Sequence, residues 1–269
     1  MPKSHFSFKR KIWIRSSEMK LSFMTFVCPE WEIEKIVQFA AEAGYDGVEI
    51  RVDAEHKHEI SSRSSDEKRK YVKKLFDNAG VEVSCVATSV QFGSSDIAKR
   101  RENIEVAKAN LNLAADLGAK VVRLFAGGGI PKLTDEAADY IAAAFDEVGN
   151  YAMESGVCPM LESGHDIIKS AVEAAEVIKR VKTSNFGILW NHSEMDAQTF
   201  DLLKNHIRHF HVHDEVLAPE NDNILHLAKL MKSINYDGYV SLEIIKGHNL
   251  PEELLIETAK RLKGYIAQA

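Results

Sequence analysis

The sequence has few cysteines, which limits the covalent and metal chemistry that it can support. Its 269 residues include three, Cys28, Cys85 and Cys158. They lie far apart, so no pair has the spacing of a zinc motif, and an odd number cannot form a framework of fully paired disulfides. Each stands on or beside an apolar run. We therefore expect small core residues in a reducing, cytoplasmic compartment.

Long apolar runs and an excess of basic charge are also missing. No run approaches the roughly 20 apolar residues of a membrane span, so we expect no membrane partner. The net charge of −6 is spread along the chain and leaves no basic stripe for a phosphate backbone, which argues against nucleic acid as a partner. Hydrophobic residues make up 45% and charged residues 28%, which is enough for a large globular core.

The first residues differ from the rest of the chain. Residues 1–18 carry several basic side chains but lack the apolar centre of a secretory signal. Met19 and Lys20 then lead directly into the apolar run LSFMTFV. We predict an N-terminal extension at residues 1–19 and one domain at residues 20–269, because no linker or low-complexity segment divides the remainder.

From residue 21 onward, short apolar runs alternate with longer amphipathic segments. The runs have strand composition and are bounded by turn residues; they lie at 21–27, 46–51, 81–88, 120–126, 157–163, 186–191, 207–213 and 238–245. The segments between them show helical spacing, with Ser65 and Thr134 as candidate N-caps and Gly44 and Gly118 as candidate C-caps. Strict alternation predicts parallel strands joined by helices.

Two closures fit this pattern, an open doubly wound sheet and a closed barrel. The count of eight strands and the length favour a single (β/α)8 barrel, a TIM barrel in the α/β class. The first strand is followed by Cys28-Pro29-Glu30-Trp31 instead of the glycine-rich turn that binds dinucleotides. We therefore predict the barrel.

The seventh run carries three histidines. Side chains alternate along a strand, so His209, His211 and His213 share one face while Phe210 and Val212 share the other. A buried imidazole needs partners for both ring nitrogens. A metal or an acid–base site would supply them for the whole row. The alternative is that one or two are satisfied core histidines and the third lies at a solvated strand end.

Polar residues stand where the active site of such a barrel lies, at the C-terminal ends of the strands. Five of the eight predicted ends carry them: Glu49 and Arg51, Glu162, Asn191 and His192, His211 and His213, and Glu243. Carboxylates inside apolar strands are costly unless they are paired or bind a cation. A divalent metal would meet that need, and the mostly oxygen ligand set suits Mn, Mg or Co, with Zn also compatible. The alternatives are a Glu49–Arg51 salt bridge, and solvated strand ends for Glu162 and Glu243.

Five segments, taken in order and spacing, indicate a family. They are AGYDGVEIR (43–51), LGAKVVRLFAGG (117–128), the strand end at Glu162, HFHVHD (209–214) and GYVSLEI (238–244). With them the chain resembles the xylose-isomerase-like TIM-barrel superfamily, the sugar phosphate isomerase/epimerase group that includes ketose 3-epimerases, inosose dehydratases and, more distantly, endonuclease IV. The resemblance covers roughly residues 20–265.

The resemblance implies a ligand set for a divalent metal. The family's ligands follow strands five to eight, and by position they are Glu162, Asn191, His211 and Glu243. Glu49 matches a residue that contacts substrate, and Arg123 a basic residue on the fourth strand.

The chain departs from the family pattern in three places. Asn191 replaces the usual aspartate and removes one negative charge. Glu194 stands where the family has a histidine, and His192, two positions earlier, is the candidate for that role. The family's histidine that often follows the glutamate of strand five corresponds to His165, which is displaced here by the insertion-like Ser163-Gly164.

These residues and the resemblance together predict a metal-dependent isomerase or epimerase. It would act on a small sugar, sugar phosphate or cyclitol by proton transfer through an enediolate. Glu162 and Glu243 are the expected catalytic residues, and substrate contacts are expected from Glu49, Arg51, His165, His192 and His213. A dehydratase of the inosose type and a non-catalytic sugar-binding barrel with a degraded metal site are the alternatives. The choice of sugar and the oligomeric state, a homo-oligomer included, stay open.

Overall fold

Eight parallel strands close on themselves in sequence order, so that β1 pairs with both β2 and β8. The structure is a computed structural model that describes residues 19–192, 197–217, 222–244 and 249–269. The strands are β1 (Lys20–Met24), β2 (Gly47–Arg51), β3 (Glu82–Gln91), β4 (Val121–Phe125), β5 (Cys158–Ser163), β6 (Gly187–Trp190), β7 (Ile207–Val212) and β8 (Tyr239–Leu242). The predicted (β/α)8 barrel is confirmed.

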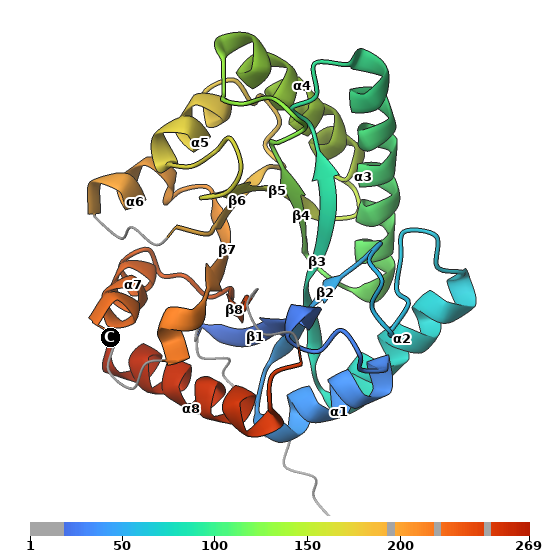
Figure 1. The fold of residues 1–269 in the computed structure, drawn as a ribbon, viewed down its shortest axis with the longest axis vertical. Coiled ribbons are helices and arrows are strands. Elements are labelled where there is room, and N and C mark those ends of the chain that lie inside the picture. The colour runs from blue at the N-terminus through green and yellow to red at the C-terminus, as the bar shows by residue number, and fades with distance from the viewer. Residues whose placement is uncertain (1–18, 193–196, 218–221, 245–248) are drawn as a thin grey trace, which may run out of the picture.

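Helices surround the barrel on its outside, as the view along its axis shows (Figure 1). They are α1 (Ile33–Ala43), α2 (Asp66–Ala79), α3 (Ile97–Leu117), α4 (Asp135–Tyr151), α5 (Ala171–Ile178), α6 (Ala197–Leu203), α7 (Asp222–Ser233) and α8 (Glu252–Gln268), with short 3-10 helices η1 (Thr25–Val27) and η2 (Asp214–Leu217). Ser65 and Thr134 cap α2 and α4 through their side-chain oxygens, as predicted. Gly44 follows α1 with a φ of 78°, which a residue with a Cβ adopts only at a cost.

Several strands end earlier than the sequence predicted, and this places the polar residues just past them. The first strand stops at Met24 because Thr25 turns into η1, where its hydroxyl accepts the backbone N–H of Arg51 at 3.0 Å. Asn191 and Glu243 each follow their strand by one residue. The backbone N–H of Glu243 still donates to the Val212 carbonyl at 2.9 Å, so β7 continues to hold this side chain in place.

The apolar core has two parts. The larger lies between the strands and the helices and includes Phe23, Phe76, Phe145 and Trp190. The smaller, formed by Cys85, Val121, Met160 and Leu189, fills the barrel interior. Its position follows from the strand register, because Cys85 pairs with Glu49, Met160 with Arg123 and Leu189 with His209, and paired residues share a face of the sheet. The ionisable side chains of Glu49, Arg123 and His209 therefore stand directly beside these apolar residues.

Two further expectations concern the chain as a whole. Residues 1–18 of the predicted extension lie outside the described residues, whereas Met19 is described and packs in the core. Among the described residues, no helix has the length and apolar character needed to cross a membrane.

Candidate active site

Three charged side chains meet at the C-terminal end of the barrel. Glu162 lies near the end of β5, His211 near the end of β7, and Glu243 just after β8. One ligand atom from each lies within 4.8 Å of the others, and all three residues are buried. The C-terminal ends of parallel barrel strands surround one hollow, which explains why residues 81 positions apart, Glu162 and Glu243, come together.

Arg123, in the middle of β4, joins the two glutamates. Its Nε lies 3.3 Å from Glu162 Oε2 and its Nη1 donates to Glu243 Oε1 at 3.1 Å. Its Nη2 donates to the Thr88 carbonyl at 3.1 Å, which fixes the guanidinium in the barrel. No site role was predicted for Arg123 from the sequence, where it matched only a basic residue on the family's fourth strand. The signal was a cation inside the apolar run VVRLF, which requires buried anions beside it.

His211 lies between two carboxylates. Its Nε2 is 3.1 Å from Glu49 Oε1 and 3.0 Å from Glu49 Oε2, and its Nδ1 is 3.0 Å from Glu243 Oε2. Burial lowers the pKa of His211, but the charges of Glu49 and Glu243 together outweigh burial and raise this pKa to well above its ordinary value. In the described structure His211 is therefore an imidazolium that pairs with both acids.

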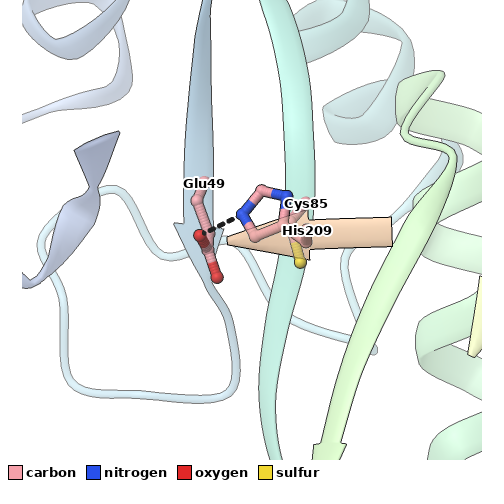
Figure 2. Close-up of side chains that lie close together, drawn as sticks. All are labelled: Glu49, Cys85 and His209. Atoms are coloured by element: carbon pink, nitrogen blue, oxygen red, sulfur yellow. Dashed lines mark hydrogen bonds and ion pairs between the residues drawn. The ribbon is translucent and has the colours of Figure 1, made fainter. Parts of the chain in front are cut away.

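Glu49 forms a second cluster deeper in the barrel with His209 and Cys85, the inner cluster (Figure 2). His209 Nε2 lies 2.9 Å from Glu49 Oε2. Burial raises the pKa of Glu49, yet His211 and His209 together hold it well below the usual range. Burial lowers the pKa of His209 and raises that of Cys85, so both stay neutral.

The alternative of a Glu49–Arg51 salt bridge is wrong. Arg51 donates to the backbone carbonyls of Val52 at 2.6 Å and Ala87 at 3.2 Å, and to the hydroxyl of Ser89. Glu49 is fully buried. Its imidazole partners therefore satisfy it without the arginine.

The other histidines expected to contact substrate line the same end of the barrel at different depths. His213 Nε2 lies 3.2 Å from Glu243 Oε2, with 29% of its side chain exposed. His192 follows Asn191, and burial lowers its pKa to about 4. His165 lies in the loop after β5, where its ring stands 5.0 Å from that of Phe125. Glu194 lies outside the described residues.

The fit of a divalent cation can be judged from buried atoms that lack hydrogen bonds. Among the buried atoms of the described residues that make no hydrogen bond are Glu162 Oε2, Asn191 Oδ1 and His211 Nδ1, although Arg123 Nε lies 3.3 Å from the first and Glu243 Oε2 lies 3.0 Å from the last. They belong to three of the four predicted ligands, and their carboxylate, amide and imidazole chemistry suits a cation. Asn191 Nδ2 donates to Glu162 Oε1 at 2.5 Å, so the amide already contacts this carboxylate. The chemistry of the four predicted ligand residues therefore fits a divalent cation.

Glu162 and Glu243 differ in proton affinity although both contact Arg123. Burial and the charge of Glu243 raise the pKa of Glu162, against the opposing effect of Arg123. Burial also acts on Glu243, but His211, His213 and Arg123 hold its pKa well below the ordinary value. One carboxyl thus tends to keep a proton while the other stays ionised, an arrangement typical of acid–base pairs.

A cavity of about 650 Å³ lies away from these groups, beside the N-terminal ends of β7 and β8, where Lys204, Arg208 and Tyr236 line it. Conserved chemistry in such barrels lies at the opposite end. The converging carboxylates, not the size of this cavity, therefore locate the candidate active site.

The fold and these side chains define a class, a (β/α)8 barrel with a buried carboxylate and imidazole site at the C-terminal ends of its strands. A family model described as xylose isomerase-like TIM barrel matches residues 37–265. The chain belongs to this family, as the sequence resemblance predicted.

Solved structures of sugar epimerases share the fold. A D-tagatose 3-epimerase-like protein has a TM-score of 0.77 at 22% identity, covering 93% of this chain and 98% of that one. The 3-keto-D-glucoside 4-epimerase YcjR from E. coli has a TM-score of 0.76 at 18% identity, covering 92% and 100%. The IolI protein, solved with a bound zinc atom, has a TM-score of 0.75 at 20% identity, covering 93% and 99%. No curated protein matches the sequence significantly.

Proposed function

We propose that this protein is an isomerase or epimerase that acts on a small sugar, sugar phosphate or cyclitol. It would transfer a proton at a carbon next to a carbonyl, through an enediolate. The observation that carries this proposal is the pair of buried carboxylates, Glu162 and Glu243, which contact one arginine and converge with His211 in one hollow. The sugar epimerases with the same fold support the substrate class.

The two glutamates would exchange the proton with opposite faces of the substrate carbon. The ionised carboxylate removes the proton, the C–H electron pair forms the enediolate C=C bond, and the carbonyl π pair moves to the oxygen. The second carboxyl group returns a proton to the other face, which gives the epimer. Return to the neighbouring carbon gives the isomer. The unequal pKa values of Glu162 and Glu243 suit them to start as acid and base.

The cation belongs to the same proposal. Glu162, Asn191, His211 and Glu243 would hold a divalent ion, which supplies Lewis-acid stabilisation for the charge that develops on the substrate oxygens. Mn, Mg or Co suits this set, and the zinc bound by IolI supports Zn as well. Asn191 adds an amide oxygen instead of a charge, so we expect weaker affinity than an aspartate would give.

Arg51, His165, His192 and His213 would hydrogen-bond the hydroxyl or phosphate groups of the substrate. They stand at or just after the C-terminal ends of β2, β5, β6 and β7. Their placement holds the reacting carbon against the acid–base pair, where an error of about 1 Å costs rate. Glu49 is fully buried between two imidazoles, so we propose that it supports His211 instead of touching substrate.

The test is deuterium exchange from solvent into ketohexoses, their phosphates and inososes, followed by NMR in the presence of Mn, Mg, Co or Zn. Wild-type protein should exchange one substrate and form its epimer or isomer. Glu243→Gln should reduce the exchange by about 100-fold or more, the usual contribution of a general acid or base. Glu257→Gln, an exposed change on α8, is the matched control and should exchange normally.

Other outcomes would refute the assignment. Undiminished exchange in Glu243→Gln removes this residue from the chemistry. Loss of water from the product in mass spectrometry identifies a dehydratase. Tight sugar binding that is unaffected by a chelator, with no exchange in any substrate, identifies a binding protein.

A further inference from the structure

A continuous line of contacts connects the inner cluster to the candidate active site. His209 Nε2 lies 2.9 Å from Glu49 Oε2, and Glu49 in turn contacts His211 Nε2 through both oxygens, at 3.1 and 3.0 Å. All three side chains are fully buried. The opposite nitrogen of His211, Nδ1, lies 3.0 Å from Glu243 Oε2. The line therefore begins beneath the proposed cation site and ends at it.

We infer that Glu49 is a positioning residue that keeps a proton on His211 Nε2, so that His211 binds the cation through Nδ1, and that His209 holds Glu49 in place. This inference rests on the proposed function, since it assigns His211 as a cation ligand. An ionised carboxylate only accepts hydrogen bonds, so each ring nitrogen that contacts it must carry a hydrogen. By the same rule His211 Nδ1 carries a hydrogen in the ion-free protein, where it faces Glu243 Oε2 at 3.0 Å. A cation held by His211 and Glu243 would take the place of that hydrogen, which leaves as a proton, and would bind the lone pair of Nδ1 while Nε2 keeps its own hydrogen.

His211 Nδ1 lies on the side of the ring that faces the other proposed cation ligands. It faces Glu243 Oε2 at 3.0 Å, and Glu162 Oε2 and Asn191 Oδ1 are buried without a hydrogen bond to any described residue. A carboxylate behind a ligating imidazole fixes the ring and raises its basicity, and such outer groups contribute strongly to affinity. Both oxygens of Glu49 contact an imidazole nitrogen, so neither is left to hydrogen-bond a substrate. Its contacts suit a group that acts through His211.

An ion held directly by Glu49, Cys85 and His209 is the competing explanation, because one ligand atom of each lies within 4.8 Å of the others (Figure 2). In the described structure both oxygens of Glu49 are already in contact with an imidazole nitrogen. An ion in the cluster would have to displace at least one of these contacts. It would also remove the support of His211. A cobalt–thiolate bond would distinguish the two explanations, because the inner cluster contains Cys85 whereas the proposed ligands Glu162, Asn191, His211 and Glu243 include no thiol.

The experiment compares Glu49→Gln with Cys85→Ala in the full chain. The amide keeps the size of the carboxylate but presents an N–H to one imidazole and loses the negative charge. We expect Glu49→Gln to weaken Co²⁺ and Zn²⁺ binding by calorimetry about 10- to 100-fold. Glu49→Asp, which keeps the charge, should recover part of that loss. Cys85→Ala should bind both ions with wild-type affinity.

Two further measurements do not depend on how Glu49→Gln folds. In the wild-type protein with Zn²⁺, imidazole ¹⁵N NMR should find the proton of His211 on Nε2 and none on Nδ1. With Co²⁺, no sulfur-to-cobalt charge-transfer band should appear. A proton on Nδ1, or ion affinity in Glu49→Gln equal to that of wild type, would overturn the inference. A cobalt–thiolate band that disappears in Cys85→Ala would place the ion in the inner cluster and overturn it as well.

Ion binding and catalysis are read separately, so the two proposals can fail separately. Loss of affinity in Glu49→Gln without any wild-type turnover would refute the proposed reaction and support the role of Glu49. Wild-type turnover together with unchanged ion affinity in Glu49→Gln would support the proposed reaction and refute the role of Glu49. If wild type takes up no ion, the inference and the cation ligands both fall, whereas the acid–base roles of Glu162 and Glu243 are still tested by exchange.

Discussion

The barrel interior holds two clusters of similar composition that differ in how their polar atoms are satisfied. In the inner cluster, Glu49 accepts contacts from His209 and His211 and is left with no unpartnered oxygen among the described residues. In the upper cluster, formed by Glu162, His211 and Glu243, the buried Glu162 Oε2 has no hydrogen bond to a described residue and only an ion-pair contact with Arg123 Nε at 3.3 Å. Both clusters are equally buried. His209 Nδ1 in the inner cluster is also buried without a hydrogen bond, so the clusters differ in their carboxylates: both oxygens of Glu49 contact an imidazole, whereas Glu162 Oε2, within the described part of the chain, faces only the Arg123 Nε at 3.3 Å.

Arg123 accounts for much of the difference between the clusters. It contributes one positive charge to two carboxylates in the upper cluster and contacts each through a different nitrogen. The inner cluster relies on imidazoles alone. Each of the following predictions removes or strengthens one side of this comparison.

The largest effect is expected from Arg123→Leu. Removing one partner of a buried ion pair leaves unpaired charge and costs about 3–5 kcal/mol. Urea unfolding with a chelator present should show this loss, and a divalent cation should restore stability in the variant more than in wild type. Arg101→Leu, which changes an exposed arginine of α3, serves as control and should unfold close to wild type. Equal losses in both variants would show that Arg123 is not what balances Glu162 and Glu243.

The His211–Glu243 pair should make stability depend on pH at both ends of a window. The pKa of Glu243 is lowered from 4.5, so its contribution is complete above about that pH and is lost as pH falls through the folded value. The pKa of His211 is raised from 6.5, so its contribution is complete below about that pH and is lost as pH rises through the folded value. Metal-free protein should therefore be most stabilised by this pair between pH 4.5 and 6.5.

His211→Asn tests that window, because it removes the imidazolium and keeps a polar side chain. The difference in unfolding free energy between wild type and the variant should shrink as pH rises above 6.5. A difference that stays constant from pH 5 to pH 9 would mean that folding does not shift the pKa of His211, contrary to its two carboxylate contacts.

Asn191→Asp strengthens the upper cluster. The extra carboxylate adds a charged oxygen where Asn191 Oδ1 now lies without a partner. We expect affinity for a divalent cation to rise on the order of tenfold, measured by calorimetry. Without the cation the variant should be less stable, because the new charge stands beside Glu162. Unchanged affinity would show that position 191 does not contact the ion.

Most of the fold could be predicted from the sequence, because its signals are local. Strand composition, helical spacing and caps such as Ser65 act within a few residues, and eight alternating units admit few closures. Strand ends were less predictable. The change from β1 to η1 depends on Thr25 accepting a hydrogen bond from Arg51, and that partner lies 26 positions away in the sequence.

The candidate site was predictable where alternation along one strand sufficed, and less so where partners had to be chosen. From the sequence, Glu162, His211 and Glu243 could be placed at the C-terminal ends of the fifth, seventh and eighth strands, which surround one hollow in a barrel. The partner of Glu49 could not, because Arg51 is nearer in sequence whereas His209 and His211 reach it across the barrel. The bridging role of Arg123 depends on the same long-range geometry.

The smallest effect is expected from Cys85→Ala, and it tests whether the inner cluster is only a support. The sulfur belongs both to the apolar cluster in the barrel and to the group around Glu49, and burial keeps its pKa well above the ordinary value. Removing a neutral thiol should cost about 1 kcal/mol in urea unfolding, the size of an average substitution, without altering solvent exchange into substrate. A loss of exchange comparable to that of Glu243→Gln would mean that the thiol takes part in the site, and the distinction between the two clusters would then fail.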